Sequence, residues 1–400
     1  MESLLEQQHR PRLYTFERRA ATSTPRHRMG VLPPETRQDD ATMKLVALTV
    51  SPLSVPLLDP FVIATATMTH TRAVLVEATV EREGMRASGL GEAAALPPVT
   101  TEDQPDLLAA LEAIAPALVG ASFEPSQIGD VVVSLGLGPV ACGALECALE
   151  DAVARLEGVP LHRALGSAGP LPELVTDITL PIGDPGHLAA LALAYRGRGF
   201  ASFKVKVGKD RRSDRAVLTA LARALPAARV RLDANEGYSA DDALGLLDDA
   251  SALGLDVECF EQPCSRHDAH ALSRVTASSA VPIVADESCR SLADVDRIAS
   301  EGLAHAVNLK LVKLGGVRAS LAVGRRAREL GLRLMAGAMV ETRLGLSAMA
   351  HVVTALGGVD FLDLDTAFLL ADDPFRGGYR SDGAKLELDG GAGLGVTRIG

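Results

Sequence analysis

The chain has 400 residues, of which 47% are hydrophobic and 23% charged, and its formal net charge at pH 7 is −11. These values are typical of a globular protein with about two domains, and the negative charge argues against nucleic acid or an anionic lipid surface as a partner. No apolar run approaches the roughly 18 residues that cross a bilayer, so no membrane segment is predicted. The five cysteines form no CxxC pair, and we expect reduced, buried thiols in a cytoplasmic protein.

The first residues of the chain differ in composition from the rest. Residues 1–42 are polar, rich in arginine and interrupted by proline, and they lack the apolar core of a secretory signal. We therefore predict a disordered N-terminal extension over 1–42. The alternative is that translation starts at Met43, where a strand-like pattern begins at once.

An α+β domain is predicted for residues 43–168. Segments 44–57 and 72–83 have strand-like patterns, and a third segment, RASGLGEAA, follows a Glu-Gly turn. Segments 106–118 and 143–166 instead show the apolar spacing of helices. Strands followed by helices favour an α+β arrangement.

Residues 169–368 alternate between short apolar strands and amphipathic helices, which predicts an α/β fold built as a (β/α)8 barrel. Eight strand segments can be counted: DITLPIG, SFKVKVG, VRLDANEG, VECFEQP, PIVADES, HAVNLKL, RLMAGAM and DFLDLDT. The Gly-rich tail, 369–400, contains one strand-like patch, AKLEL, and is expected to return to the first domain.

Lysine is rare in this chain, and its positions indicate a site. Only seven lysines occur, and five of them lie in the two short runs FKVKVGK and NLKLVKLGG. A lysine can lose its proton when it is desolvated or crowded by cations, whereas arginine cannot. Lys204 and Lys206 point the same way on a strand, so both are expected inside the barrel, as is Lys310. Lys209 and Lys313 are expected to be ordinary surface residues.

Three acidic residues follow successive predicted strands between these lysines. They are Asp233, Glu261 and Asp286, and the steps from Lys206 through these three to Lys310 are about 24 to 28 residues, the length of one barrel unit. Each acid alone is equally well explained as the start of a helix. Because the carboxyl ends of barrel strands open onto one face, the three together predict a Mg²⁺ site.

Two lysines on opposite sides of a divalent metal predict proton transfer at carbon. Lys310 follows the strand four units after that of Lys206 in a ring of eight, which places it across the site. The metal would hold a substrate carboxylate and stabilise the enediolate that forms when the α-proton leaves. One lysine would remove that proton and the other return it to the opposite face, giving racemisation or epimerisation.

These motifs, from Met43 to the C-terminus, resemble the muconate-lactonizing branch of the enolase superfamily. The resemblance rests on KVK at 204–206, DAN at 233–235, EQP at 261–263, DES at 286–288 and NLKLVKLGG at 308–316. It implies a capping domain over a modified TIM barrel, with Lys206 and Lys310 as the acid/base pair and Lys204 in support. It also implies one Mg²⁺ held by Asp233, Glu261 and Asp286, with Asn235 and Glu287 in supporting positions beside the metal ligands.

Two later segments are similar to those of dipeptide epimerases, which include the L-Ala-D/L-Glu epimerases. They are MAGAMVETRLGLSAMAH at 335–351 and DLDTAFLL at 363–370. Asp363 and Asp365 are two residues apart, so both can face inward and accept the ammonium group of a dipeptide. The predicted partner is therefore a small dipeptide, in an enzyme that we also expect to form a homo-oligomer. A helix-capping role is the alternative for this Asp pair.

One position departs from the pattern of the glutamate-specific epimerases. Their capping loop carries an arginine for the glutamate side chain, and Ala66 stands at that place in PFVIATATMTHTR. His70 or Arg72 could substitute, although Arg72 is better placed to open the next strand. The resemblance therefore implies a dipeptide whose second residue is apolar or small.

Other functions share most of these residues. The same metal and lysines would serve an N-acylamino-acid racemase, an o-succinylbenzoate synthase or a muconate cycloisomerase. The substrates of these enzymes, however, have no ammonium group for the Asp pair to bind. A sugar-acid dehydratase of the mandelate-racemase type is disfavoured because MAGAM lacks that branch's histidine. A non-catalytic binding protein on this scaffold would be expected to have lost a ligand or a lysine, and none is missing.

Overall fold

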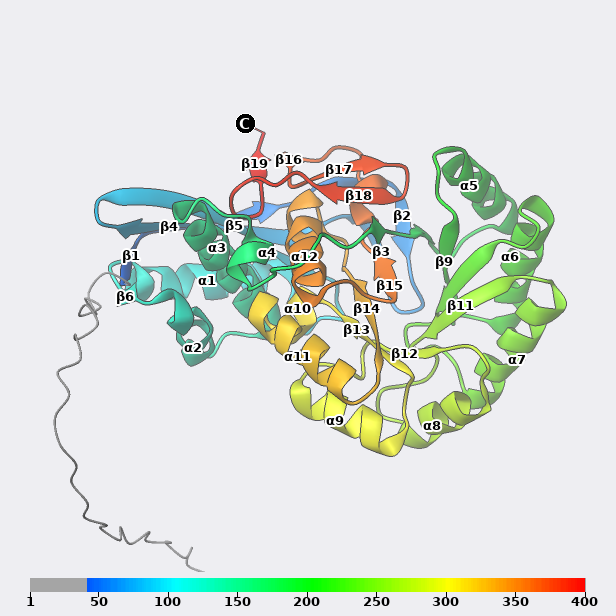
Figure 1. Ribbon diagram of the computed structural model, residues 1–400. Helices are drawn as coiled ribbons and strands as arrows, with labels where there is room; N and C mark the ends of the chain where they lie inside the picture. The colour runs from blue at the N-terminus through cyan, green and yellow to red at the C-terminus, as the bar shows by residue number, and fades with distance from the viewer. Residues whose placement is uncertain (1–41, 400) are drawn as a thin grey trace, which may run out of the picture. The chain divides into compact units, whose positions relative to one another are not determined.

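The computed structural model describes residues 42–399 (Figure 1). The predicted N-terminal extension, apart from its last residue, lies outside the described residues. The fold is a nearly closed barrel of eight parallel strands with an N-terminal capping domain, as predicted. The domain boundaries given above stay predictions.

The capping domain contains a four-stranded sheet in the order β5-β4-β1-β6, antiparallel throughout. Its strands and helices are β1 (Met43–Leu53), β4 (Arg72–Arg82), β5 (Met85–Ala95), α1 (Gln104–Leu118), β6 (Ser122–Phe123), α2 (Ile128–Ser134), α3 (Pro139–Leu156) and α4 (Leu161–Ala164). A separate hairpin of β2 (Pro56–Val62) and β3 (Thr67–His70) leaves this sheet.

Helix α3 packs directly on β5 because two glycines let the backbones approach. A Cβ atom on Gly89 would lie 2.2 Å from the carbonyl oxygen of Ala148, and one on Gly91 would lie 1.9 Å from that of Ala144. Any larger residue at either glycine would push the helix away from the sheet. The apolar face of α3 is buried along its whole length as a result.

The eight-stranded sheet runs in chain order from β8 to β15 with every pairing parallel. The strands are β8 (Ile178–Leu180), β9 (Ser202–Lys206), β10 (Arg229–Asp233), β11 (Asp256–Glu261), β12 (Ile283–Ala285), β13 (Ala306–Leu309), β14 (Arg333–Gly337) and β15 (Phe361–Asp363). Each of the eight predicted strand segments is thus a barrel strand.

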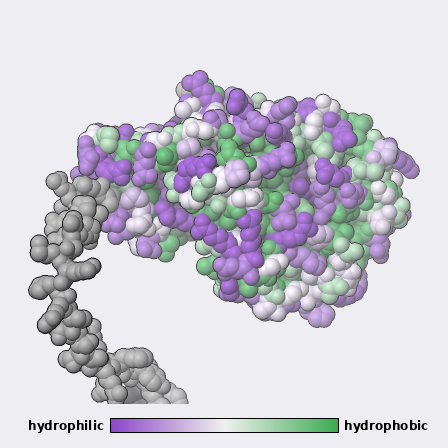
Figure 2. All heavy atoms as spheres, viewed as in Figure 1, coloured by the Kyte–Doolittle hydropathy of each residue, from purple (hydrophilic) through white to green (hydrophobic). Residues whose placement is uncertain are grey.

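Helices alternate with these strands and lie outside them (Figure 1). They are α5 (Pro185–Gly197), α6 (Arg211–Ala224), α7 (Ala240–Ala252), α8 (Ala269–Ser278), α9 (Leu292–Glu301), the single turn α10 (Leu311–Leu314), α11 (Val317–Glu329) and α12 (Arg343–Leu356), with the 3-10 turn η2 (Thr366–Leu369) after β15. No helix in the described part of the chain is long and apolar enough to span a membrane. On the face shown in Figure 2, hydrophilic residues are interspersed with small apolar areas.

The barrel closes between β8 and β15 without a regular ladder. Individual hydrogen bonds bridge this seam: the N–H of Asp177 donates to the carbonyl of Leu362 at 3.2 Å, and the N–H of Thr179 donates to Oδ2 of Asp365 at 2.5 Å. A carboxylate from a predicted site residue therefore also joins the first strand to the last.

The C-terminal tail forms more strands than the sequence indicated. Besides β18 (Lys385–Leu388), which was predicted, it contains β16 (Phe375–Gly377), β17 (Tyr379–Asp382) and β19 (Val396–Arg398). β18 pairs with β17 and with β7 (Leu174–Val175). The tail also returns to the capping domain, where the N–H of Leu394 donates to Oδ1 of Asp151 in α3 at 2.7 Å.

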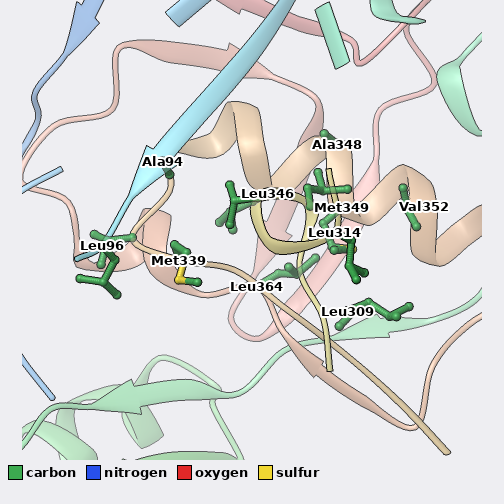
Figure 3. Packing of buried hydrophobic residues seen from close by; sticks show 14 of the residues in the cluster. Ala94, Leu96, Leu309, Leu314, Met339, Leu346, Ala348, Met349, Val352 and Leu364 are labelled. Atoms are coloured by element: carbon green, nitrogen blue, oxygen red, sulfur yellow. The ribbon is translucent and has the colours of Figure 1, made fainter. Parts of the chain in front are cut away.

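The buried carboxylate of Glu92 forms hydrogen bonds between the capping domain and the barrel. Glu92 in β5 accepts hydrogen bonds from the N–H and hydroxyl of Thr342 at 3.0 and 2.6 Å and from the N–H of Gly345 at 3.0 Å, at the N-terminus of α12. Orphan N–H groups and the positive end of the helix dipole favour an anion there. Figure 3 shows part of the apolar core, including Ala94 in β5, Leu96 directly after β5, and Met339.

Candidate active site

A cavity lies where the carboxyl ends of the barrel strands meet the capping domain. About 380 Å³ of empty volume lies there, part of it open to solvent. The barrel supplies its polar lining and the capping domain supplies apolar residues. The lining residues are Phe61, Ile63, Leu96, Val99, Thr179, Lys204, Lys206, Asn235, Lys310, Ala338, Met339, Asp363, Asp365 and Thr366.

Lys204 and Lys206 both point into this cavity from β9, as the two-residue spacing predicted. Nζ of Lys204 lies 2.6 Å from Oε2 of Glu261, 2.7 Å from Oδ2 of Asp363 and 3.0 Å from Oδ2 of Asp233. Burial lowers the pKa of Lys204, but these carboxylates more than offset it and hold the pKa well above its ordinary value. Lys204 is therefore a fixed cation.

Lys206 has fewer anionic neighbours than Lys204. Its Nζ lies 2.6 Å from Oδ2 of Asp233 and 3.3 Å from Oδ1 of Asn235. The ring centroid of Phe61, from the capping hairpin, is 5.8 Å away on another side. Lys206 therefore has one carboxylate partner, whereas Lys204 has three.

Lys310 directly follows β13, four strands from β9 around the barrel, as predicted. Its Nζ donates to Oδ2 of Asp286 at 2.7 Å and lies 3.8 Å from Oε1 of Glu261. Because Lys206 and Lys310 both line the one cavity, amines approach it from opposite sides of the ring.

The prediction that Lys313 is an ordinary surface residue is wrong, whereas Lys209 is exposed as predicted. The side chain of Lys313 is 2% exposed, and its Nζ donates to Oδ1 of Asp286 at 2.7 Å. Helix α10 starts immediately after Lys310 and turns this side chain back toward the barrel. The sequence offered one signal for this, since the two positions are three residues apart, the spacing of one helical turn.

The three predicted metal ligands lie side by side on neighbouring strands. Asp233 ends β10, Glu261 ends β11 and Asp286 follows β12, and none of them is more than 1% exposed. Burial opposes ionisation of Asp233 and Asp286, but adjacent lysines keep the pKa of both carboxyls below its usual range. Oε2 of Glu261 makes no hydrogen bond of good geometry, although Lys204 is close.

Asn235 and Glu287 are buried next to this group, where the resemblance placed supporting residues. Nδ2 of Asn235 donates to Oε1 of Glu287 at 3.2 Å, and Oε2 of Glu287 has no hydrogen-bond partner among the described residues. Burial raises the pKa of Glu287 to about 8, with Asp286 and Asp233 adding to the rise. The raised pKa favours the protonated carboxyl at neutral pH, and its Oε2 is available for a further hydrogen bond.

A second carboxylate group, not foreseen from the sequence as a set, contains the Asp pair. Carboxylate oxygens of Asp177, Asp363 and Asp365 lie within 4.8 Å of one another and are buried. Arg231 binds Asp177 at 2.9 Å and Lys204 binds Asp363 at 2.7 Å. Burial, reinforced by Asp363, raises the pKa of Asp365 to about 7.

Two oxygens of this Asp group make no hydrogen bond among the described residues, Oδ1 of Asp177 and Oδ1 of Asp365, and of these two residues Asp365 lines the cavity. Oδ2 of Asp365 accepts the N–H of Thr179, whereas Oδ1 of Asp365 is buried and makes no hydrogen bond among the described residues. Leaving a buried carboxylate oxygen unpaired costs free energy, which a cationic ligand would recover. The barrel end of the cavity is therefore suited to an ammonium group.

The capping side of the cavity is apolar. Ala66 lies in the turn between β2 and β3, where its carbonyl accepts the N–H of Ile63, and it is not among the cavity-lining residues. Arg72 opens β4 and pairs with Asp103 at 2.5 Å, and His70 is exposed at the end of β3. Phe61 and Ile63 reach the cavity instead, a contribution the sequence could not reveal because it depends on how the hairpin docks.

Sequence and structure comparisons agree with this geometry. A family model for the mandelate racemase / muconate lactonizing enzyme N-terminal domain matches residues 46–166, and one for the enolase C-terminal domain-like family matches residues 187–398. The fold and site define a protein of the enolase superfamily. Within it, the chain belongs to the mandelate racemase/muconate lactonizing enzyme family.

Individual relatives within this family are named as dipeptide epimerases. The chain is 38% identical to an aromatic dipeptide epimerase of Herpetosiphon aurantiacus, over 88% of this chain and 98% of the relative. It is 32% identical to the L-Ala-D/L-Glu epimerase of Bacillus subtilis, over 88% and 97%. A crystal structure of a dipeptide epimerase from Enterococcus faecalis, complexed with Mg and L-Leu-L-Tyr, aligns with a TM-score of 0.80 at 29% identity, covering 89% of this chain and all of that one.

Proposed function

We propose that this protein is an isomerase that epimerises dipeptides in a Mg²⁺-dependent reaction, by two-base proton transfer at the α-carbon next to the carboxylate. One observation carries the proposal: a single cavity brings Lys206 and Lys310 together with Asp363 and Asp365. The first pair can move a proton on carbon, and the second pair, in which Oδ1 of Asp365 makes no hydrogen bond among the described residues, can accept the ammonium group that a dipeptide provides.

Asp233, Glu261 and Asp286 are the residues proposed to hold Mg²⁺. They fit the ion because they are buried carboxyl oxygen donors on adjacent strand ends, and Oε2 of Glu261 lacks a well-formed hydrogen bond. When bound there, Mg²⁺ supplies positive charge that offsets the negative charge developing on the substrate carboxylate as the α-proton leaves. Cations pair with the Asp177–Asp363–Asp365 group as well, Arg231 with Asp177 and Lys204 with Asp363, so ion pairing does not separate the two groups. Their position at three successive strand ends favours the first group as the Mg²⁺ ligands.

Lys206 and Lys310 are proposed to exchange the roles of base and acid. In one direction Lys206 removes the α-proton and Lys310 returns a proton to the opposite face, and in the other direction the roles reverse. Lys204 takes no proton because its three carboxylate contacts keep it charged. Its fixed charge supports Lys206 by neutralising part of the carboxylate group between them.

The substrate ammonium is proposed to bind at Asp363 and Asp365. Two observations support this proposal: Oδ1 of Asp365 makes no hydrogen bond among the described residues, and burial followed by Asp363 raises the pKa of that carboxyl to about 7, so a cation nearby would favour its charged form. An ammonium offers three donors and one positive charge. An N-acylated amino acid offers neither, which favours a free dipeptide over the racemase, synthase and cycloisomerase alternatives.

The second residue of the dipeptide is proposed to be apolar. Phe61, Ile63, Leu96 and Val99 form the capping side of the cavity, and no arginine is among its lining residues in the described part of the chain. A glutamate side chain would bury its charge there without a partner, which is costly. Relatives include proteins named as hydrophobic and aromatic dipeptide epimerases.

The direct test compares kcat/KM for three substrate sets: free dipeptides, their N-acetyl forms and N-succinylamino acids. We expect L-Ala dipeptides that end in an apolar residue to be epimerised fastest, L-Ala-L-Glu more slowly, and N-acetyl dipeptides not at all. Asp365→Asn should raise KM for dipeptides about 10-fold or more, because a charged hydrogen bond is lost, without changing Mg²⁺ affinity.

The outcomes separate the alternatives. Preference for N-succinylamino acids would replace the dipeptide proposal with the racemase alternative. Preference for L-Ala-L-Glu would overturn only the proposed apolar specificity. A chain that binds dipeptides without epimerising any would indicate a binding protein on this scaffold.

Two further expectations accompany this proposal. A cytoplasmic location is supported by the five cysteines, all of which are free and buried. Assembly into a homo-oligomer stays a prediction.

A further inference from the structure

We infer that Lys313 is a positioning residue for the reaction proposed above, holding Asp286 and Lys310 in place without contacting substrate. Its Nζ donates to Oδ1 of Asp286 at 2.7 Å, to the carbonyl oxygen of Asp286 at 2.6 Å and to the carbonyl oxygen of Asn308 at 2.9 Å. All three ammonium hydrogens are thus used. The inference rests on the proposed roles of Asp286 and Lys310.

These three bonds join two neighbouring strands at their catalytic ends. Asp286 follows β12, and Asn308 lies in β13 two residues before Lys310. The N–H of Lys313 also donates to the carbonyl of Lys310 at 3.1 Å, closing the turn of α10. The segment from Asn308 to Lys313 is therefore folded back on itself, with Lys310 held in the middle.

The carboxylate of Asp286 is held from both sides. Lys313 binds its Oδ1, and Lys310 binds its Oδ2 at 2.7 Å. Two ammonium groups on the two oxygens of one carboxylate fix the plane of that carboxylate. Lys313 is not among the cavity-lining residues, so its effect on a ligand must pass through Asp286 and Lys310.

Lys209 provides a matched control. Lys313 follows Lys310 by three residues, and Lys209 follows Lys206 by three, but Lys209 is exposed. Helix α6 does not begin until Arg211, so no helical turn returns the Lys209 side chain to the barrel. Lys209→Met removes the same charge at the same sequence spacing without removing a contact to the site.

The proposed experiment measures α-proton exchange in D₂O, starting separately from each epimer of one dipeptide at saturating Mg²⁺. Lys206→Ala and Lys310→Ala first establish which epimer each lysine deprotonates. In Lys313→Met, exchange from the Lys310-dependent epimer should fall about 10-fold more than exchange from the other, and the Kd for Mg²⁺ measured by calorimetry should rise about 10-fold, as for other residues that support metal ligands. Lys209→Met should match the wild-type protein in both measurements.

Equal losses from the two epimers would mean that Lys313 only stabilises the fold, and unchanged exchange with unchanged Mg²⁺ affinity would also overturn the inference. If Lys313→Met does not fold by circular dichroism, Lys313→Gln, which keeps a hydrogen-bond donor, takes its place. If the wild-type protein exchanges no dipeptide proton, the proposed function fails. Mg²⁺ calorimetry then decides the inference about Lys313 alone, and an unchanged Kd overturns it.

Discussion

The two lysine runs of this chain resemble each other in sequence but act differently in the structure. On the β9 side, the supporting cation Lys204 precedes Lys206 by two residues on the same strand. On the β13 side, Lys313 follows Lys310 by three residues on a helical turn. Each proposed base therefore has a second lysine near it, supplied by a strand in one case and by a helix in the other.

The difference between Lys209 and Lys313 shows what decides the position of a side chain beyond a strand end. After Lys206 the chain passes through Gly208, with φ of 99°, and moves away from the barrel before α6 begins. After Lys310 the helical turn begins at once. A spacing of three residues places two side chains on one face only where the backbone is helical.

The largest expected effect tests whether Lys206, on the β9 side, and Lys310, on the β13 side, are equivalent bases. Lys206→Ala and Lys310→Ala should each reduce epimerisation by about 10³-fold or more, because each removes a general acid/base group. Each variant should still exchange the α-proton of one epimer, and the two variants should retain opposite epimers. Chiral chromatography and mass gain in D₂O measure both effects.

Near wild-type epimerisation by both single variants would contradict the assignment of Lys206 and Lys310 as the two bases. Exchange of the same epimer by both variants would also contradict it, because a single base would then serve both faces. Lys209→Met is the control for a lysine removed from the same region.

A second, smaller effect concerns the metal. Asp233 contacts the β9 lysines and Asp286 contacts the β13 lysines. Asp286→Asn should weaken Mg²⁺ binding about 10²-fold, because it removes an ionised ligand and leaves two buried ammonium groups underpaired. Calorimetry with Mg²⁺ measures this, and chelation by EDTA should stop turnover until Mg²⁺ is restored.

Asp210→Asn, an exposed helix cap at the start of α6, is the control for the metal prediction. Full activity after exhaustive chelation would contradict the metal assignment. Normal Mg²⁺ affinity in Asp286→Asn would instead move the metal away from the β13 side.

The smallest expected effect is on the free energy of unfolding and concerns Glu146, a buried acid in α3 that lies next to the segment after Lys313. Glu146 in α3 lies against Gly316, where a Cβ atom would come within 1.6 Å of its Oε2, and burial followed by Glu150 raises its pKa to about 8. The folded chain keeps this proton up to about pH 8, whereas the unfolded chain loses it near the ordinary glutamate value. The free energy of unfolding should therefore fall as pH rises between those values.

Urea unfolding at about pH 5 and about pH 8 measures this dependence. Glu146→Gln should lose less stability over that interval than the wild-type protein, because it has no proton to release. Glu92 and Glu341, with pKa values raised by burial to about 7 and about 8, contribute slopes of the same sign and remain in the variant. An identical slope in the variant would contradict the position of Glu146.

The barrel and its lysines and acids could be predicted because both follow from local rules. Apolar runs predict the strand segments. Residues at the carboxyl ends of barrel strands lie on one face, and this does not depend on the helices between the strands. The position of Lys313 required knowing that a helix begins directly after Lys310. The contribution of Phe61 required knowing how a hairpin more than 140 residues away in sequence docks on β9, as its 5.8 Å contact to Lys206 shows.

The short C-terminal strands were missed for a related reason. Strands β16, β17 and β19 are three or four residues long and lie among glycines, so no period can establish itself. Their partners lie elsewhere in the tail, since β16 pairs with β19 and β17 pairs with β18. Such strands are defined by tertiary contact, which a local pattern does not record.

The seam between β8 and β15 has an evolutionary consequence. Asp365 both closes the barrel, through the N–H of Thr179, and presents the unpaired oxygen proposed to receive the substrate. If the proposed role of Asp365 holds, a substitution there is expected to change ligand preference and also to weaken the barrel at the junction between β8 and β15, which lacks a ladder. Phe61 carries no such double duty, since its backbone belongs to a hairpin outside the barrel. We therefore expect substitutions that alter substrate preference to be tolerated better at Phe61 in the hairpin than at Asp365.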